Sequence, residues 1–252
     1  MEHAGKHALV TGGGSGIGKG IALALAAAGA EVTITGRNGD RLAQVAASHP
    51  RLHVLIMDVD DESSIRAGIA AAAAARGPVQ ICVANAGIAL GGPFAQTSLA
   101  AWRQTMTTNL DGVFLTFQAA LETLPADLPA RMIVVSSIAG LRGLKNAVPY
   151  TVSKHGVIGL IRGLSEEYMR RPITFNALCP GYVDTAIVRN QLPGLMQRFD
   201  LDEAGAVELI AKGNRHRRLL EVDETTAAAL WLCSDGARSV NGQTIQISGG
   251  QV

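Results

Sequence analysis

The sequence has few cysteines and no strong charge of either sign. Its 252 residues include 3 cysteines, Cys82, Cys179 and Cys233, which are far apart and lie in apolar sequence. We therefore expect buried free thiols in a reducing compartment rather than a disulfide framework. Because 22 Lys and Arg face 21 Asp and Glu, the formal net charge of +1 favours neither nucleic acid nor a membrane surface as a partner.

Long apolar runs and metal-ligand motifs are absent as well. No segment approaches the roughly 18 consecutive apolar residues that a membrane-spanning helix needs, and no apolar signal core precedes residue 7. The sequence contains neither a Cys-x-x-Cys pair nor a His-Glu-x-x-His motif. We therefore expect a cytoplasmic protein without a metal site.

Short apolar segments rich in β-branched residues alternate with longer Ala- and Leu-rich segments along the chain. Such alternation predicts parallel strands joined by crossover helices, and the uniformly apolar strands indicate a sheet covered by helices on both faces. The expected strands are residues 8–11, 32–35, 54–57, 81–84, 132–135, 173–178 and 244–247, and the expected helices are residues 17–28, 41–48, 63–76, 99–124, 150–170 and 224–233.

The first expected strand runs directly into a glycine-rich turn and then into a helix. The turn reads Thr11-Gly12-Gly13-Gly14-Ser15-Gly16-Ile17-Gly18. Glycines let the backbone approach a pyrophosphate, and the free N–H groups of a helix start attract an anion. In this context the turn predicts a dinucleotide site in a doubly wound, Rossmann-like α/β fold, with residues 1–252 as a single dinucleotide-binding catalytic domain.

The end of the second strand bears on which dinucleotide is bound. Where an NAD enzyme would place a carboxylate on the adenosine ribose, this chain has Gly36 followed by Arg37. A guanidinium binds a 2′-phosphate, so NADP(H) is favoured. Asp40 is close enough in sequence to reach a ribose hydroxyl, which keeps NAD(H) as the alternative.

Tyr150, Lys154 and Ser137 form a candidate catalytic group. Tyr150 and Lys154 are four residues apart on one face of an expected helix. An adjacent ammonium and a nearby nicotinamide cation both favour the phenolate, so we expect a lowered pKa for Tyr150 and a role as general acid and base. Ser137 follows an expected strand, at the edge of the sheet where ligands bind, and its hydroxyl can stabilise a developing negative charge on a carbonyl oxygen.

Gly12, Gly16 and Gly18 follow a Gly-x-x-x-Gly-x-Gly pattern, and with Tyr-x-x-x-Lys the whole chain resembles the single-domain short-chain dehydrogenase/reductase family. The family's Asn-Asn-Ala-Gly motif appears with its first Asn replaced by Ala84. The resemblance implies a homotetramer with Ser137, Tyr150, Lys154 and Asn109 as catalytic residues, Asn109 holding a water that links Lys154 to solvent. It also implies cofactor contacts from Gly12, Ser15, Gly16, Ile17, Gly18, Asp58, Val59, Asn85, Ala86, Gly87, Tyr150, Lys154, Pro180, Gly181, Val183 and Thr185.

The expected reaction is reversible hydride transfer between a nicotinamide cofactor and a small-molecule carbonyl or secondary alcohol. The irregular region from Pro180 to about Leu201 is expected to cover the site, with a substrate lid at about residues 183–216. Apolar residues of the lid and of nearby loops would suit a hydrophobic ketone or an acyl chain: Ile187, Val188, Leu192, Leu195, Met196, Phe199, Leu90, Phe94, Leu141 and Leu144.

A basic run, Arg215, His216, Arg217 and Arg218, follows the lid. It could attract the phosphates of a coenzyme A or carrier-protein thioester, such as a 3-oxoacyl or 3-hydroxyacyl substrate, or it could be a solvated helix end. A non-catalytic dinucleotide-binding sensor or scaffold is the alternative function, which the Ser137, Tyr150, Lys154 and Asn109 set disfavours. A methyltransferase would need an acidic ribose ligand that Gly36 and Arg37 do not offer.

Overall fold

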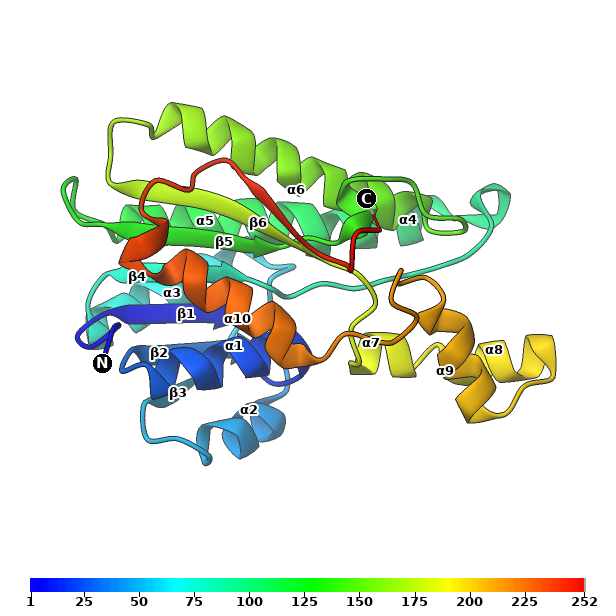
Figure 1. Cartoon of the computed structure of the whole chain (residues 1–252). Helices are drawn as coiled ribbons and strands as arrows, with labels where there is room; N and C mark the ends of the chain where they lie inside the picture. Colours follow the sequence, from blue (N-terminus) through cyan, green and yellow to red (C-terminus); the bar gives the residue numbers. More distant parts are fainter. Residues whose placement is uncertain (252) are drawn as a thin grey trace.

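Seven parallel strands form one sheet in the order β3-β2-β1-β4-β5-β6-β7 (Figure 1). The computed structural model describes residues 1–251. The chain order reverses between β1 and β4, where doubly wound sheets open a crevice at the carboxyl ends of the strands. This confirms the predicted Rossmann-like α/β fold. The strands are β1 (His7–Thr11), β2 (Glu31–Gly36), β3 (Leu52–Ile56), β4 (Val79–Ala84), β5 (Ala130–Val135), β6 (Ile173–Pro180) and β7 (Thr244–Ile247).

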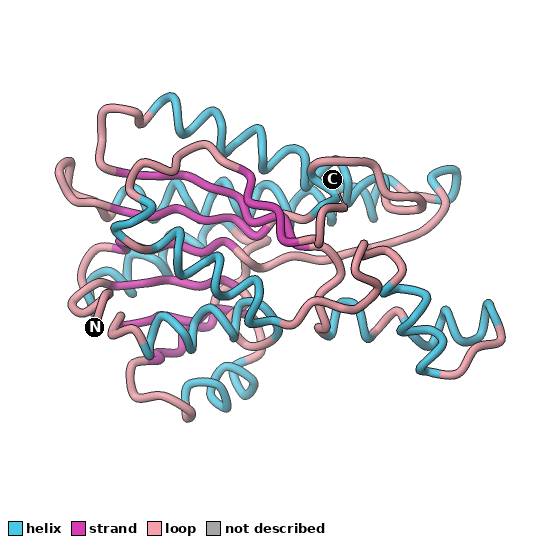
Figure 2. Tube along the Cα trace, viewed as in Figure 1, coloured by secondary structure: helices cyan, strands magenta, loops and turns pink. Residues whose placement is uncertain are grey.

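Helices cover both faces of the sheet (Figure 2). One face packs against α1 (Gly16–Ala27), α2 (Gly39–Ala46) and α10 (Val222–Cys233), with Ile21, Leu42 and Leu232 fully or almost fully buried. The other face packs against α3 (Glu62–Arg76), α5 (Gly112–Glu122) and α6 (Val148–Glu167), where Ile65, Phe117 and Ile161 are buried. Every residue of β1, β5 and β6 is buried, which explains why their sequences are mostly apolar.

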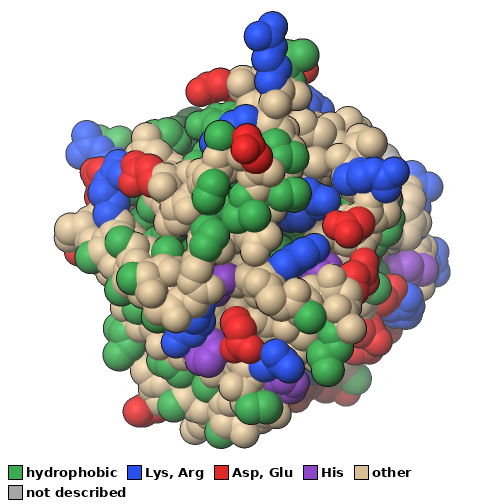
Figure 3. All heavy atoms as spheres, turned by 90° about the vertical axis from the view of Figure 1, so that its left-hand side faces the viewer, with side chains coloured by type: hydrophobic (Ala, Val, Ile, Leu, Met, Phe, Trp, Pro, Cys, Tyr) green, Lys and Arg blue, Asp and Glu red, His purple; other side chains and the backbone are tan. Residues whose placement is uncertain are grey.

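The edge where the strands begin is closed by side-chain packing. His7 opens β1 and contacts Gly77 and Thr33 through its two ring nitrogens, at 2.8 and 2.9 Å. On the surface at this edge, basic, acidic and hydrophobic side chains are interspersed (Figure 3). The three cysteines are free and buried, as expected, and burial raises the pKa of Cys82 and Cys233 to about 12.

Two helix boundaries refine the sequence predictions. Asp61 caps α3, because its Oδ1 accepts a hydrogen bond from the Ser63 N–H at 2.9 Å. The single helix predicted over residues 99–124 is divided into α4 (Leu99–Met106), a π-helical turn η2 (Thr107–Asp111) and α5. The π turn contains Asn109, whose buried side chain bonds outside its own helix. Such turns frequently occur at functional sites.

The region after β6 is helical rather than irregular. It contains α7 (Ala186–Arg189), α8 (Leu192–Phe199) and α9 (Glu203–Ala211), so the loop predicted from residue 180 to about 201 was wrong. These helices lie beyond the carboxyl edge of the sheet (Figure 1) and are joined by a small apolar cluster of Val188, Leu192, Ala206 and Ile210.

The remaining described elements are single 3-10 turns, η1 (Phe94–Gln96), η3 (Ile138–Gly140) and η4 (Asp235–Ala237). Among the helices of residues 1–251, none has the length and apolar character required to cross a membrane.

Candidate active site

The glycine turn between β1 and α1 holds the backbone close to its neighbours. Gly12 and Gly16 have φ values of +66° and +52°, which residues with a Cβ rarely adopt. A Cβ on Gly12 would lie 2.9 Å from Asn85 Nδ2, and one on Gly18 would overlap both Asn85 and the Gly12 backbone. The glycines are therefore required by close packing of this turn.

The start of α1 is open to an anion. Ser15 is the N-cap residue, but its side chain makes no capping hydrogen bond, and the first turn carries no acidic residue. The N–H groups of that turn, at Gly16, Ile17 and Gly18, thus lack the usual side-chain acceptor. An exposed helix start of this kind suits a phosphate or pyrophosphate.

The strand β4 is tied to the glycine turn through Asn85. Thr11 Oγ1 accepts hydrogen bonds from the Asn85 and Ala86 N–H groups, both at 3.0 Å. In return, Asn85 Nδ2 donates to the Thr11 carbonyl at 2.9 Å. These bonds hold Asn85, Ala86 and Gly87 against the turn even though Ala84 replaces the first Asn of the family motif.

A hollow of about 190 Å³ lies beside the glycine turn, between the ends of β1 to β4. It is lined by Gly12, Gly36, Arg37, Met57, Asp58, Val59, Asp60, Ala86, Gly87, Ile88 and Thr108. Arg37 projects here with 69% of its side chain exposed, and its Nη1 is 4.0 Å from one carboxylate oxygen each of Asp58 and Asp60. The structure therefore brings together the residues expected at the adenosine end of the cofactor.

Ser137 and Tyr150 meet at the carboxyl end of β5. Ser137 follows this strand and is 8% exposed, and Tyr150 lies in the first turn of α6. Burial raises the pKa of Tyr150 above its usual value, and a hydrogen bond with Ser137 acts against this rise. The expected lowering of the Tyr150 pKa is thus not produced by the protein's own groups, because desolvation of the phenolate outweighs them.

Lys154 lies one helical turn beyond Tyr150, with its Nζ 5.6 Å from the centre of the Tyr150 ring. The ammonium donates a hydrogen bond to the Val135 carbonyl at 2.8 Å and is 5% exposed. Burial lowers the pKa of Lys154 to about 8. Among residues 1–251 no carboxylate is close enough to form an ion pair with it.

The neighbouring serines of the Ser136-Ser137 pair point in different directions, as strand alternation predicts. Ser136 Oγ donates to the Lys154 carbonyl at 3.1 Å, so it anchors the backbone of α6. Ser137 accepts a hydrogen bond from the Ala139 N–H at 3.1 Å, and its hydroxyl acts to lower the pKa of Tyr150. Only Ser137 is therefore placed beside the phenol.

Asn109 is fully buried beneath the same site. Its Oδ1 accepts from the Ile88 N–H and its Nδ2 donates to the Ile88 carbonyl, both at 2.8 Å, and Nδ2 also donates to Ser153 Oγ at 3.1 Å. The side chain thus fixes the backbone just after Gly87. A Cβ added to Gly87 would lie 3.6 Å from Lys154 Nζ. The water-holding role expected of Asn109 stays a prediction.

The segment after β6 connects the site to the helices beyond it. Gly181 N–H bonds to Ile247 at 2.9 Å, and Val183 pairs with Leu220 in an isolated parallel bridge. Thr185 packs against the glycine turn, 3.2 Å from where a Cβ on Gly16 would lie. Thr185 therefore borders the start of α1, and the nicotinamide contacts expected of Pro180, Gly181, Val183 and Thr185 stay a prediction.

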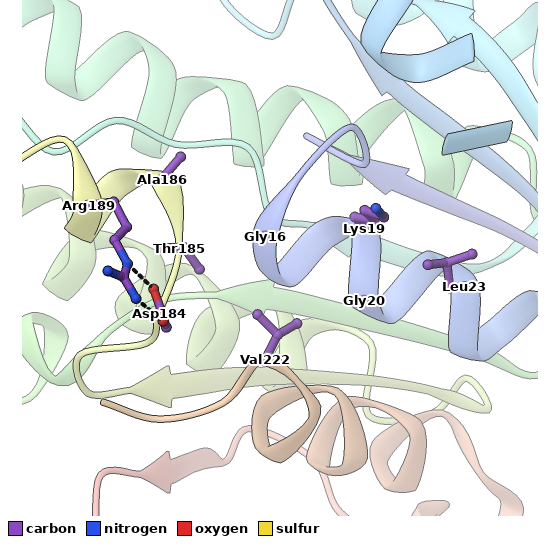
Figure 4. A pocket seen from close by; sticks show the side chains of 9 residues that line it. All are labelled: Gly16, Lys19, Gly20, Leu23, Asp184, Thr185, Ala186, Arg189 and Val222. Carbon is purple, nitrogen blue, oxygen red and sulfur yellow. Dashed lines mark hydrogen bonds and ion pairs between the residues drawn. The ribbon is translucent and has the colours of Figure 1, made fainter. Parts of the chain in front are cut away.

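A second hollow, of about 450 Å³, lies on the outer side of Gly16 (Figure 4). It is bounded by α1, α7 and the start of α10, and Lys19, Arg189 and Val222 line it. In Figure 4 the Arg189 guanidinium faces the Asp184 carboxylate, with two hydrogen bonds of 2.6 Å. Arg189 also reaches Glu203 at 3.2 Å, so it ties α7 to the start of α9.

Three residues that the sequence reasoning did not single out belong to this neighbourhood. Ser153 bonds to Asn109, Tyr182 is close enough to Tyr150 to affect its pKa, and the buried Asn214 holds the Tyr182 backbone. The position of Ser153, three residues after Tyr150 on the same expected helix, could have indicated that it lies near the site. Nothing in the sequence marks Asn214, because its partners are backbone groups, those of Tyr182 being 32 residues away.

The fold and this group of residues define a nicotinamide-dependent oxidoreductase. A family model described as short chain dehydrogenase matches residues 6–195. The chain belongs to this short-chain dehydrogenase/reductase family, whose members use NAD(P), and it is a reductase that acts on carbonyl and CH–OH groups.

Known relatives cover nearly the whole chain. The granaticin polyketide synthase putative ketoacyl reductase 1 of Streptomyces violaceoruber is 38% identical over 252 residues, which is 96% of this chain and 92% of the relative. The acetoacetyl-CoA reductase of Rhizobium meliloti (strain 1021) is 34% identical, with 97% of each protein covered. A variant of actinorhodin polyketide ketoreductase, solved with NADPH, superposes with a TM-score of 0.93 at 30% identity, covering 98% of this chain and 97% of that one.

Proposed function

We propose that this protein uses NADPH to reduce the 3-oxo group of an acyl thioester to a 3-hydroxy group. The observation that carries the proposal is the convergence of Ser137, Tyr150 and Lys154 at the carboxyl edge of the sheet, next to a glycine turn open to a dinucleotide. A dinucleotide-binding sensor would need the glycine turn but not the serine, phenol and ammonium. No feature of the site favours that second candidate.

The residues present fit a dinucleotide. The uncapped start of α1, at Ser15, Gly16, Ile17 and Gly18, would hold the pyrophosphate, and the hollow lined by Arg37, Asp58, Val59 and Ala86 would hold the adenosine. Asn85 and Gly87 would form the floor beneath the nicotinamide ribose. Pro180, Gly181, Val183 and Thr185 would receive the nicotinamide end, because Thr185 in this segment packs against Gly16 of the same turn.

The protein's contribution to the reaction is proton transfer and charge stabilisation. When bound, NADPH supplies a hydride to the carbonyl carbon. The Tyr150 hydroxyl donates its proton to the carbonyl oxygen, and the Ser137 hydroxyl donates a hydrogen bond to the same oxygen as negative charge develops there. The products are the alcohol and a Tyr150 phenolate, which is reprotonated from solvent before the next turnover.

Lys154 favours the phenolate that this step leaves behind. Because burial raises the pKa of Tyr150, the hydroxyl is protonated in the resting enzyme and available as the acid. The ammonium stands 5.6 Å from the Tyr150 ring and stabilises the negative charge after transfer. Asn109 positions Ile88 and Gly87 beside Lys154, and the relay of a proton through a water held at Asn109 is part of this proposal.

The choice of NADPH over NADH rests on Arg37. Its guanidinium is mostly exposed and only loosely approached by Asp58 and Asp60, at 4.0 Å each, so it is free to bind a 2′-phosphate. We expect Arg37→Asp to weaken NADPH binding by about tenfold or more, since one charge-assisted contact is lost and a repulsion is added. Fluorescence titration with both dinucleotides tests this, and an Arg37→Asp variant that still prefers NADPH would refute the assignment.

The thioester assignment draws on the relatives and on the region above the site. The relatives include a putative ketoacyl reductase and an acetoacetyl-CoA reductase. The lid, residues 183–216, offers partly buried apolar side chains at Leu195 and Met196, next to the cluster of Val188 and Leu192. The test is a panel of 3-oxoacyl thioesters and simple hydrophobic ketones with NADPH. Faster reduction of every ketone than of every thioester would contradict the assignment.

The same proposal treats residues 1–252 as one catalytic domain that acts as a homotetramer. The exposed apolar side chains Phe114 and Val152, on α5 and α6, would pack between subunits. Light scattering at micromolar concentration tests this, and a monomer that retains full activity would contradict it.

A further inference from the structure

The turn formed by residues 214–217, called the basic turn below, carries two arginines without ion-pair partners. Arg215 and Arg217 are exposed, and among residues 1–251 no carboxylate lies within 4.0 Å of either guanidinium. Arg218 differs, because its guanidinium holds both oxygens of Glu224 at 2.6 and 2.9 Å. The four-residue basic run is therefore divided into one structural arginine and two free ones.

The basic turn is anchored rigidly beside the candidate active site. Asn214 is fully buried, and its Oδ1 accepts from the Tyr182 N–H at 3.0 Å while its Nδ2 donates to the Tyr182 carbonyl at 2.9 Å. His216 packs against Gly249, where an added Cβ would lie 2.5 Å from the ring Cδ2. Tyr182 comes two residues after β6, and β6 pairs with β5, the strand that leads into Ser137. Arg215 and Arg217 are thus held at the carboxyl edge of the sheet, near the end of α9 (Figure 1).

Arg217 occupies a backbone conformation that an arginine adopts only at a cost. Its φ is +54°, and its N–H closes the turn on the Asn214 carbonyl at 2.9 Å. Glycine would take this left-handed conformation without strain. Strained backbone often marks a functional position. Here the strain is accompanied by an unpaired guanidinium, so the Arg217 side chain gives the fold no ion pair in return.

We infer that Arg215 and Arg217 bind the phosphate of a 4′-phosphopantetheine arm while its 3-oxoacyl thioester reaches Ser137 and Tyr150. Two guanidinium groups at the rim of the site suit a phosphate diester, which is singly charged and accepts hydrogen bonds from planar N–H donors. The arm is common to coenzyme A and to acyl carrier proteins, so this chemistry is shared by both sources. The inference rests on the thioester assignment proposed above.

The test measures kcat/KM with acetoacetyl-coenzyme A, an acetoacetyl carrier protein and acetoacetyl-N-acetylcysteamine, which lacks the phosphate. The variants are Arg215→Gln, Arg217→Gly and the double variant, and Arg170→Gln is the control. Arg170 is an exposed arginine just after α6, remote from the basic turn, so its replacement changes the net charge as much as either single variant does.

We expect the double variant to lose roughly fivefold in kcat/KM, mainly through KM, with both phosphorylated substrates and nothing with the N-acetylcysteamine thioester. This loss should shrink at high ionic strength, because exposed charges are screened. Arg170→Gln should match the unmodified protein throughout. Arg217→Gly should raise the melting temperature while weakening the phosphorylated substrates, which separates binding from folding.

Five results would overturn the inference. Equal losses of kcat/KM with all three substrates, or no loss with any, would show that the arginines do not bind a phosphate. A loss confined to the carrier protein would assign the turn to that protein's surface, and one confined to coenzyme A would assign it to the nucleotide phosphates. If the unmodified protein reduces simple ketones but none of the three thioesters, the proposed substrate fails, and the inference with it.

Discussion

Two buried basic side chains at opposite edges of the sheet are held in different ways. His7, where β1 begins, has a partner for each ring nitrogen, Gly77 and Thr33. Because the Gly77 carbonyl can only accept, Nδ1 carries the proton, and Nε2 accepts from the Thr33 hydroxyl. Burial lowers the pKa of His7, so the ring is neutral and fully bonded at neutral pH.

Lys154, at the carboxyl edge, has far less support. It donates one hydrogen bond, to Val135, although its ammonium can donate three. Burial lowers its pKa to about 8 from an ordinary 10.5, which at neutral pH corresponds to a folding penalty of roughly 3 kcal/mol. The contrast indicates that the amino edge is arranged for stability, whereas the carboxyl edge keeps a destabilising group for its chemistry.

The largest expected effect is a difference between the two neighbouring serines at the carboxyl edge, because one acts on turnover and the other on stability. Ser137→Ala should lower kcat by about 100- to 1000-fold, because the carbonyl oxygen loses a donor in the transition state. Ser136→Ala removes the bond to the Lys154 carbonyl and should cost about 1 kcal/mol of stability. Steady-state kinetics and urea unfolding of both variants test this. Similar kinetic losses in the two would mean that neither serine acts on the substrate.

Replacing Lys154 by Met should stabilise the protein while it impairs turnover. At pH 7 the variant should gain about 1–3 kcal/mol in free energy of unfolding, since it buries no ammonium. Between about pH 8 and 10.5 the unfolded chain binds more protons than the folded one, so the unmodified protein becomes more stable as pH rises and the gain disappears. Urea unfolding at pH 7 and pH 10 measures this; a Lys154→Met variant less stable at pH 7 would contradict the account.

At the amino edge, replacing the buried basic side chain should lower the free energy of unfolding rather than raise it. His7→Ala should lose about 2 kcal/mol at pH 7, because a buried cavity and two unpaired partners remain. The folded pKa of His7 lies below its unfolded value of about 6.5, so its stabilising contribution is complete above that pH and is lost as pH falls through the folded pKa. The unmodified protein should therefore lose more stability than His7→Ala between pH 7 and pH 5. Parallel losses would assign the acid sensitivity elsewhere.

The sheet and the glycine turn were predictable because a single physical pattern dictates each. Strands buried on both faces need continuous apolar runs, and the predicted segments fall within or beside the seven strands observed. Gly12 and Gly18 are recognisable by their place in a glycine turn between a strand and a helix, and Tyr150 and Lys154 by helical spacing. These features depend on residues close in sequence or on one repeated contact type.

The remaining features depend on long-range contacts that no local pattern encodes. The π turn at Asn109 forms around hydrogen bonds to Ile88 and Ser153, and α7 and α8 are too short for helical periodicity to emerge. The raised pKa of Tyr150 in the protein alone was not predicted, because desolvation depends on the packed site rather than on the Tyr-x-x-x-Lys spacing. The ion pair between Arg218 and Glu224 could likewise not be predicted from the basic run of residues 215–218.

The central claim is that the Tyr150 hydroxyl donates the proton to the substrate and that NADPH binding does not depend on this hydroxyl. The most direct measurement combines NADPH fluorescence titration with single-turnover oxidation of bound NADPH in Tyr150→Phe. We predict a dissociation constant within about threefold of the unmodified protein and an oxidation rate at least about 1000-fold slower, because the general acid and its hydrogen bond to the oxygen are both lost. An oxidation rate close to that of the unmodified protein would contradict the account.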